Sequence, residues 1–295
     1  MPPAPPRASL AVLAAAAGSI CVGTVPMLAI ELYRGGMNTQ SMLFWRYWIA
    51  LVFLVPLAVY SSAGLLTEWR NAGRGLFLNA ITLGALQTFT YFRAIQTLPS
   101  SIVVTIFFTY PMFAVAIDQV VFGRKARWST ILAVLLIFLG VLLTGWPHLT
   151  FNAVEPIGLV CAILTPLIFS VYIAIAYRFT RQSSAFAGAT FIYGGLGCTF
   201  ALIVLLFGLD HPAGFDGWGR LISIATVGGA IQIASFAYAL PRLSASGYSI
   251  IVSLELVTVA LLGVTVLGES LSVVQSLGIA LVVVGIIVER LLRQE

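Results

Sequence analysis

Long apolar runs separated by short polar breaks constrain this chain of 295 residues more than any other feature. Charged residues make up 8% of the sequence, whereas an ordinary soluble domain contains about 25%. So few charges do not cover a water-facing surface, which argues against a soluble enzyme of this length. A helix of about 20 apolar residues crosses a hydrocarbon core of about 30 Å. The runs therefore predict a protein embedded in a lipid bilayer.

Charged residues, Gly and Pro clusters and other polar residues coincide at places that divide the chain into ten apolar segments. Each segment is predicted to be helical, because lipid offers no hydrogen-bond partner for an exposed peptide group. The expected fold class is an all-α membrane protein with ten transmembrane helices. The predicted spans lie near residues 8–33, 38–60, 74–98, 100–122, 127–146, 154–177, 183–208, 217–241, 243–267 and 271–291.

The basic residues predict the orientation, since cytoplasmic loops carry an excess of Lys and Arg. With the N-terminus in the cytoplasm, only Arg34 and Arg220 fall on the opposite side, while Arg46 and Arg93 fall inside spans. This bias favours an even number of spans with both termini in the cytoplasm. The expected location is the cell inner membrane. The residues assigned to the cytoplasmic side are Arg7, Arg70, Arg74, Arg124, Lys125, Arg127, Arg178, Arg181, Arg242, Arg290 and Arg293.

The sequence contains a weak internal repeat. It predicts two five-helix repeats, residues 1–148 and 149–295. Because five is odd, the second repeat enters the membrane from the opposite side, and such inverted repeats are the architecture of secondary transporters. A shift of 145 positions aligns Gly84 with Gly229, Gln87 with Gln232, Ala94 with Ala239, Leu98 with Leu243, Ser101 with Ser246, Ile106 with Ile251, Gly123 with Gly268, Leu136 with Leu281 and Gly140 with Gly285.

Three of the predicted helices carry distinctive motifs. They are Phe44-Trp45-Arg46-Tyr47; Leu98-Pro99-Ser100-Ser101 with Tyr110-Pro111 and Phe122-Gly123-Arg124; and Leu243 to Ser246 with Ser253-Leu254-Glu255-Leu256 and Leu267-Gly268-Glu269-Ser270. Together they resemble the EamA repeat of the drug/metabolite transporter superfamily, from about residue 8 to residue 290. Within it the chain is most similar to the YddG-type exporters, which implies export of aromatic and other amino acids.

The chain departs from the family pattern at two places. Many repeats have Gly-Glu after the fourth helix, where this chain has Gly123-Arg124. The family's glutamate is therefore present only in the second half, as Glu269. The Glu-Pro that is frequent in the ninth helix is Glu255-Leu256 here. A role that needs both glutamates is therefore not implied.

Glu255 is the leading candidate for function, because it lies near the middle of its predicted span, where a charge is costly. Its carboxylate could bind a substrate amino group or carry a proton. The alternative is a structural carboxyl that is protonated or hydrogen-bonded to a neighbouring helix. The sequence leaves these roles open.

Four further charged residues lie in or near the predicted spans. Glu31 at the end of the first span is expected to pair with Arg46 or Arg93, and either arginine could instead receive a substrate carboxylate. Asp118 is expected to form an interfacial pair with the basic residues 124–127.

Polar and aromatic residues in corresponding spans predict a cavity with apolar walls and a few hydrogen-bond partners, suited to a small amphiphilic solute. For any single aromatic side chain, helix packing is the alternative. The predicted substrate-binding residues are Gln87, Tyr91, Thr105, Phe108, Phe169, Tyr172, Gln232, Phe236, Tyr248, Ser253 and Glu255.

Two prolines occupy corresponding first helices of the repeats. Pro26 and Pro166 each remove a backbone hydrogen bond within a span. We expect them to act as hinges during transport.

The predicted function is therefore a secondary transporter that exports small metabolites, foremost amino acids, by alternating access. The alternatives are a carrier for a cationic drug, a nucleotide-sugar or a sugar phosphate, and an assembly subunit. No P-loop, H-E-x-x-H or G-x-S-x-G motif occurs, which disfavours ATP hydrolysis by the chain and intramembrane catalysis. No cofactor, metal or nucleic acid is expected; a small-molecule substrate and the bilayer are the expected partners. The oligomeric state stays open, and a monomer is compatible with the sequence.

Overall fold

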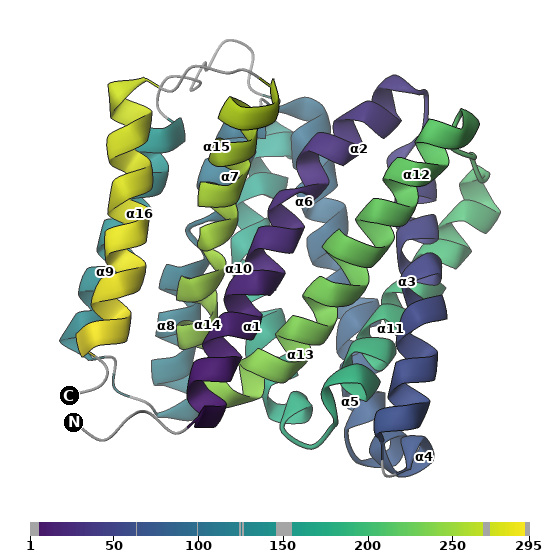
Figure 1. The fold of residues 1–295 in the computed structure, drawn as a ribbon, viewed down its shortest axis with the longest axis horizontal. Helices are drawn as coiled ribbons and strands as arrows, with labels where there is room; N and C mark the ends of the chain where they lie inside the picture. The colour runs from purple at the N-terminus through teal and green to yellow at the C-terminus, as the bar shows by residue number, and fades with distance from the viewer. Residues whose placement is uncertain are drawn as a thin grey trace. The chain divides into compact units, whose positions relative to one another are not determined.

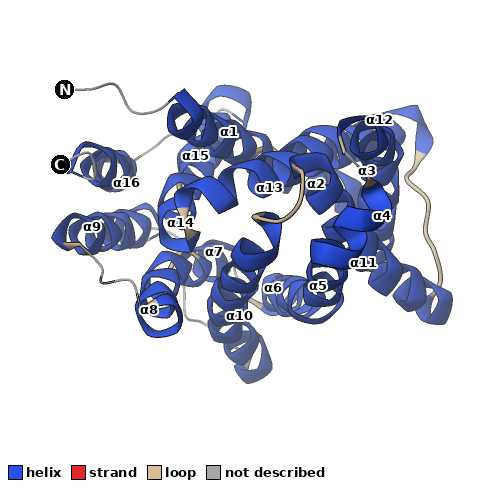
Figure 2. Cartoon of the chain, turned by 90° about the horizontal axis from the view of Figure 1, so that it is seen from below, coloured by secondary structure: helices blue, strands red, loops and turns tan. Residues whose placement is uncertain are grey.

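The chain is helical throughout its described part. A computed structural model describes residues 6–62, 64–98, 100–123, 125, 127–145, 155–267 and 272–292, and no strand occurs among them (Figures 1 and 2). This confirms the predicted all-α class. Pro26 lies in a described helix, but its side chain, like residues Arg124 and Glu269, lies outside what the structure describes.

Several helices in the described part are long and apolar enough to cross a bilayer, which confirms a multi-pass membrane protein. The ten-helix count, the two-repeat arrangement and the cytoplasmic termini stay predictions. Shorter apolar helical stretches cover Thr105–Val120, Trp128–Thr144 and Val273–Val288. The six candidate spans are Ser9–Arg34, Thr39–Ser61, Pro156–Thr180, Ala185–Phe207, Gly214–Leu243 and Ala245–Leu262.

Two compact units make up the chain, and each draws on both halves of the sequence. The first unit combines Leu86–Ala174 with Leu243–Glu295, and the second combines Arg7–Ala85 with Ile175–Arg242. Helix α6 (Ala85–Thr97) belongs almost wholly to the first unit, and α10 (Pro156–Thr180) is shared between the two.

The second unit contains the N-terminal helices and three π-helical segments. Asn38 accepts a hydrogen bond from the Ser41 amide at 2.8 Å and so begins α3. Trp48 on that helix donates to the Gly197 carbonyl at 3.3 Å and ties it to α11. The elements are α1 (Pro6–Gly23), α2 (Val25–Arg34), α3 (Thr39–Ser61), α4 (Leu65–Glu68), η1 (Trp69–Gly73), α5 (Arg74–Asn79), η2 (Ala80–Gly84), α11 (Ala185–Phe207), α12 (Gly214–Ala225), η4 (Thr226–Ile231) and α13 (Gln232–Leu243).

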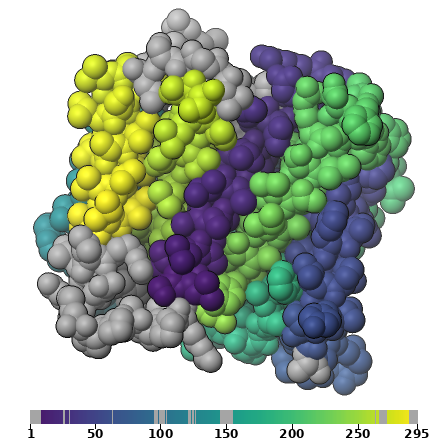
Figure 3. Space-filling view, viewed as in Figure 1, coloured from purple at the N-terminus to yellow at the C-terminus, as the bar shows by residue number. Residues whose placement is uncertain are grey.

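Within this unit α1 crosses α13 and α2 packs against α12, as the purple and green surfaces in Figure 3 show. Gly18 makes the contact possible, because a Cβ atom there would lie only 2.9 Å from the Ser235 Cβ. Small residues at such crossings let membrane helices approach closely.

The first unit contains the fourth and ninth predicted spans, each divided into two helices. Pro111 stands in the first turn of α8, where its missing amide costs no helical hydrogen bond. In addition to α6 and most of α10, its elements are α7 (Ser100–Phe107), α8 (Tyr110–Phe122), α9 (Trp128–Gly145), α14 (Ala245–Val252), α15 (Leu254–Leu267) and α16 (Val273–Leu292).

Glycines hold α9 and α16 close together, and the two helices lie side by side in Figures 1 and 2. A Cβ atom at Gly140 would lie 2.5 Å from the Gly278 carbonyl oxygen, and one at Gly285 would lie 2.8 Å from the Ala133 carbonyl oxygen. Gly140 and Gly285 are also a pair in the predicted repeat. The backbone contact therefore requires a residue without a side chain at both positions.

We expect Gly140→Val to lower the free energy of unfolding by about 1–3 kcal/mol, because the added side chain forces α9 away from α16. Gly219→Val on α12 is the matched control, since no described atom lies within 4 Å of its Cβ position. Thermal unfolding in detergent measures both variants. Equal melting temperatures would contradict the close-packing argument.

Candidate functional site

Two helix breaks lie in the first unit at positions that the predicted repeat aligns. In the fourth span α7 ends at Phe107 and α8 begins at Tyr110; in the ninth span Ser253 separates α14 from α15. The 145-residue shift overlays Phe108 on Ser253. At each break a backbone amide donates to the carbonyl three residues earlier instead of four. Thr109 donates to the Ile106 carbonyl, and Ser253 donates to the Ile250 carbonyl.

Tyr110 connects the two broken helices. Its side chain is fully buried, and its hydroxyl donates to the Ser249 carbonyl at 3.0 Å. Ser249 is the residue whose carbonyl would accept the Ser253 amide in an unbroken helix. The Ser253 hydroxyl donates to the same Ser249 carbonyl at 3.4 Å, and Tyr110 interacts electrostatically with Glu255. Tyr110 thus provides a hydrogen-bond donor for the backbone at the break in the ninth span, and it is also the first residue of α8 after the break in the fourth span.

An aromatic cluster surrounds this crossing, with Phe107 at its centre. The Phe107 ring centroid lies 5.4 Å from those of Tyr91 and Phe169, and 5.1 Å from that of Tyr110. Tyr110 and Phe169 meet edge to face at 5.0 Å. Phe108 and Tyr172 extend the cluster at 5.7 Å from Phe107 and 6.1 Å from Phe169. Rings at these distances attract one another.

Hydroxyl groups and one carboxylate complete the site. The Thr165 hydroxyl lies 2.9 Å from that of Thr90, and the Ser170 hydroxyl donates to the Tyr110 carbonyl at 2.9 Å. Glu255 stands in the first turn of α15 and is half-buried. Rings, hydroxyls and a carboxylate together can bind a small solute that has an apolar body and a positively charged group.

Many of the residues predicted to bind substrate lie in this unit, and several of them meet. The contacts described above include Tyr91, Phe108, Phe169, Tyr172, Ser253 and Glu255, and the buried Tyr248 on α14 interacts electrostatically with Tyr110. Gln87 and the buried Thr105 lie on α6 and α7 of the same unit. Gln232 and the buried Phe236 lie on α13 in the second unit.

Phe107 and Tyr110 belong to the site although the sequence did not single them out as binding residues. The Tyr110-Pro111 dipeptide was a weak signal for them, because proline fits the first turn of a helix but also occurs inside the unbroken helices α3 and α10. The break in the ninth span lacks such a signal, since Leu256 stands where Pro111 stands in the fourth.

The pairing predicted for Glu31 is wrong. Glu31 pairs with Arg34 at 2.8 Å, one helical turn away on α2, because that partner is local and exposed. Arg93 pairs instead with Glu155 at 3.1 Å, just before α10. This ion pair gives Arg93 a structural partner within its own unit.

Arg46 lies in the second unit, where it contacts backbone and aromatic groups. Its Nη2 donates to the Gly228 carbonyl in η4 at 2.7 Å, and its guanidinium hydrogen-bonds the Tyr193 side chain. The guanidinium carbon lies 5.9 Å from the Tyr47 ring centroid. These contacts hold a cation within a span by distributing its hydrogen bonds over protein groups.

Asp118 is buried and accepts a hydrogen bond from the Ser246 amide at 3.0 Å. It therefore stabilises the N-terminus of α14, where exposed amides and the helix dipole favour a negative charge. The predicted pairing with residues 124–127 falls partly on Arg124, which lies outside the described residues.

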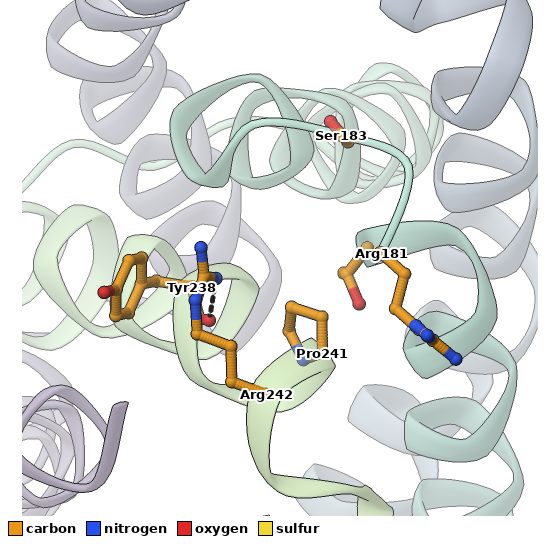
Figure 4. Close-up of a pocket in the computed structure, with 6 residues that line it drawn as sticks. Arg181, Ser183, Tyr238, Pro241 and Arg242 are labelled. Carbon is orange, nitrogen blue, oxygen red and sulfur yellow. Dashed lines mark hydrogen bonds between the residues drawn. The ribbon is translucent and has the colours of Figure 1, made fainter. Parts of the chain in front are cut away.

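A separate cavity of about 650 Å³ opens at the end of α13 (Figure 4). The guanidinium of Arg242 stacks 3.9 Å above the Tyr238 ring and donates to the Tyr238 carbonyl at 2.6 Å. The side chain of Arg181 extends away from Arg242 in this view. The cavity is lined by Thr180, Arg181, Ser183, Tyr238, Pro241 and Arg242, and the sequence did not predict it.

A family comparison decides the nature of the chain. The model of the EamA-like transporter family matches residues 9–146 and again residues 156–289. The chain belongs to the EamA-like transporter family. This confirms the resemblance to that family within the drug/metabolite transporter superfamily and establishes a membrane transporter with a small-molecule substrate. Membership in this transporter family is consistent with the expectation that the chain is not an enzyme.

Individual relatives agree with this assignment. An uncharacterized transporter of Archaeoglobus fulgidus is 22% identical over 275 residues, which is 92% of each protein. A second one from the same organism is 26% identical over 112 residues, covering 37% of this chain and 40% of the relative. A crystal structure with 17% sequence identity superimposes with a TM-score of 0.82 over 96% of this chain and 97% of that one. The last likeness shows that the EamA-type fold is shared.

We expect Tyr110→Phe to lower the free energy of unfolding by about 1–3 kcal/mol, because the buried Ser249 carbonyl loses the shorter of its two side-chain hydrogen bonds and keeps only the one from the Ser253 hydroxyl at 3.4 Å. Tyr60→Phe is the control, since the Tyr60 side chain on α3 is 92% exposed. Melting temperatures in detergent compare the two. If both substitutions had the same small effect, the Tyr110 bond would not stabilise the break.

Proposed function

We propose that the protein exports small amphiphilic metabolites, foremost amino acids including aromatic ones, across the inner membrane by alternating access. The observation that carries the proposal is the pair of repeat-equivalent helix breaks, joined by Tyr110 and surrounded by aromatic rings and Glu255. In secondary transporters, interrupted helices in corresponding positions of two halves mark the substrate site.

Two inverted five-helix repeats with both termini in the cytoplasm form the proposed architecture. The two successive family matches support a division between residues 146 and 156, which agrees with repeats 1–148 and 149–295. The distribution of Lys and Arg supports the orientation. Two related halves can exchange inward-open and outward-open states around one central site.

Amino acids fit the chemistry of the described residues better than phosphate-bearing solutes do. A nucleotide-sugar or sugar phosphate needs several available cations, and Arg93 is paired with Glu155 while Arg46 bonds the Gly228 carbonyl. A cationic drug is the second candidate, favoured by Glu255, which interacts electrostatically with Tyr110 of the aromatic cluster. Amino acids share the cationic group and the apolar body that such a site accepts.

We expect purified protein in liposomes to take up labelled aromatic amino acids faster than sugar phosphates. Glu255→Gln should reduce that flux about tenfold if the carboxylate binds the amino group, and should remove its pH dependence if the carboxylate carries the proton. Glu31→Gln is the control, since its carboxylate pairs with Arg34 at the exposed end of α2.

Two outcomes contradict parts of this proposal. Faster uptake of cationic drugs than of every amino acid would identify the second candidate as the substrate class. Flux and pH dependence both unchanged in Glu255→Gln would exclude Glu255 from either role.

Pro26 and Pro166 are proposed hinges. The first helix is interrupted at Thr24, and Pro26 stands in the first turn of α2; the Pro166 carbonyl within α10 accepts the Ser170 hydroxyl at 2.7 Å. Replacing both prolines by Ala should slow transport and leave equilibrium binding unchanged, because Pro166→Ala restores a backbone donor inside α10 and Pro26→Ala removes the ring that fixes the backbone at the start of α2. Radiolabel exchange and binding to detergent-solubilised protein measure the two quantities.

Pro56→Ala is the control, since Pro56 lies inside α3 and has no corresponding proline in the seventh span. If Pro56→Ala slowed transport equally, or the double variant transported at the native rate, the hinge proposal would be wrong.

A further inference from the structure

Two π-helical segments occupy corresponding places in the two halves of the chain. The shift that aligns Gln87 with Gln232 brings η2 (Ala80–Gly84) into overlap with η4 (Thr226–Ile231). A π-helical turn inserts one extra residue into an α-helix, and such insertions occur frequently at functional sites. One extra residue rotates the side chains of the helix that follows by about 100° about the helix axis. In each half the segment thus sets the direction of the glutamine that follows it.

Arg46 contacts η4 from α3. Its Nη2 donates to the Gly228 carbonyl at 2.7 Å, which is short for a nitrogen donor and typical of a charged one. It also hydrogen-bonds Tyr193, whose ring lies 3.6 Å from the Cβ position of Gly229. Arg46 and Tyr193 therefore approach adjacent residues of the same wide turn.

The sequence of η4 suits this arrangement. Gly228 and Gly229 disfavour a regular α-helix because their backbone is flexible. Gly228 packs directly against the Val25 side chain of α2, which leaves no room for a Cβ atom. In an α-helix the Gly228 carbonyl would accept the amide of residue 232. The Gln232 amide donates to the Gly229 carbonyl instead, and the bond from Arg46 to the Gly228 carbonyl favours this π-helical form.

We propose that Arg46 is a positioning residue that keeps η4 π-helical and thereby fixes which side chains of α13 face the interior. The residues affected are Gln232 and Phe236, whose role as substrate contacts rests on the proposed function. Arg46 would then determine substrate preference through α13 and without touching the substrate.

Loss of the π-helical form would rotate α13 more than α12. Helix α12 packs against α2 and α3 within the second unit. When η4 becomes α-helical without losing a residue, the helix after it must advance by one position. Ala237 on α13, which faces Gly188 on α11, would turn away from it.

A disulfide between these two positions reports the rotation. The Cβ position of Gly188 lies 3.6 Å from the Ala237 Cβ, within the range of disulfides. Gly188→Cys and Ala237→Cys, placed together in a variant whose Cys21, Cys161 and Cys198 are replaced by Ala, should crosslink under mild oxidation. Adding Arg46→Met should reduce the yield about tenfold, the shift expected when a buried carbonyl loses a charged donor.

Deletion of Val227 in the Arg46→Met variant tests whether the crosslink can be restored. With one residue fewer, η4 can be α-helical while α13 keeps its native direction. Arg46→Met combined with the deletion should therefore restore the crosslink and the native ratio of rates for two transported amino acids. Arg34→Met is the control, because Arg34 is exposed at the end of α2 and should change neither quantity.

Each outcome decides the proposal. Native crosslinking in Arg46→Met overturns it, and so does a crosslink that stays lost after the deletion, since Arg46 then acts elsewhere. A restored crosslink without a restored rate ratio shows that Arg46 contacts substrate directly, which also overturns it. If the native protein moves no amino acid, the proposed function fails, while the crosslinking experiment still tests the register of α13.

Discussion

Irregular backbone inside a membrane protein must find its hydrogen-bond partners within the protein, because lipid supplies none. This requirement explains where several polar side chains of the spans lie. Tyr110 donates to the Ser249 carbonyl at a helix break, and Arg46 donates to the Gly228 carbonyl of a π-helical segment. These two departures from the regular ladder are thus each accompanied by a donor from another helix. The breaks in the fourth and ninth spans also bring hydroxyls and a carboxylate into the first unit.

Much of the fold could be predicted, because the hydropathy and the length of each apolar run can be read from neighbouring residues in the sequence. A run such as Ala185–Phe207 is apolar throughout and long enough to cross a bilayer, so its helix follows from local information. The break at Tyr110-Pro111 was not located, because the span over 100–122 was predicted as one helix and a proline alone does not mark a break: Pro56 and Pro166 lie inside unbroken helices. Membership in the EamA-like transporter family agrees with the resemblance that the sequence motifs carry.

The details that the sequence did not reveal depend on contacts between distant residues. Arg93 and Glu155 are separated by 62 positions, and hydropathy carries no information about which cation meets which carboxylate. The break at Ser253 contains neither Pro nor Gly, so no local sequence signal predicts it. The π-helical segment η4 depends on Arg46, a donor 182 positions away from the carbonyl it binds. Interactions of this kind are visible only once the helices are packed.

The two breaks differ in chemistry although their positions correspond. The shift of the repeat overlays Tyr110 on Glu255 and Pro111 on Leu256. In the fourth span proline forces the break and tyrosine joins it to the ninth; in the ninth span the corresponding residue is an acid. The two breaks thus carry a phenol in the fourth span and a carboxylate in the ninth. At the proposed substrate site this difference would distinguish the two ends of a solute, which suits a small molecule with an apolar body and a charged head better than one with uniform polarity.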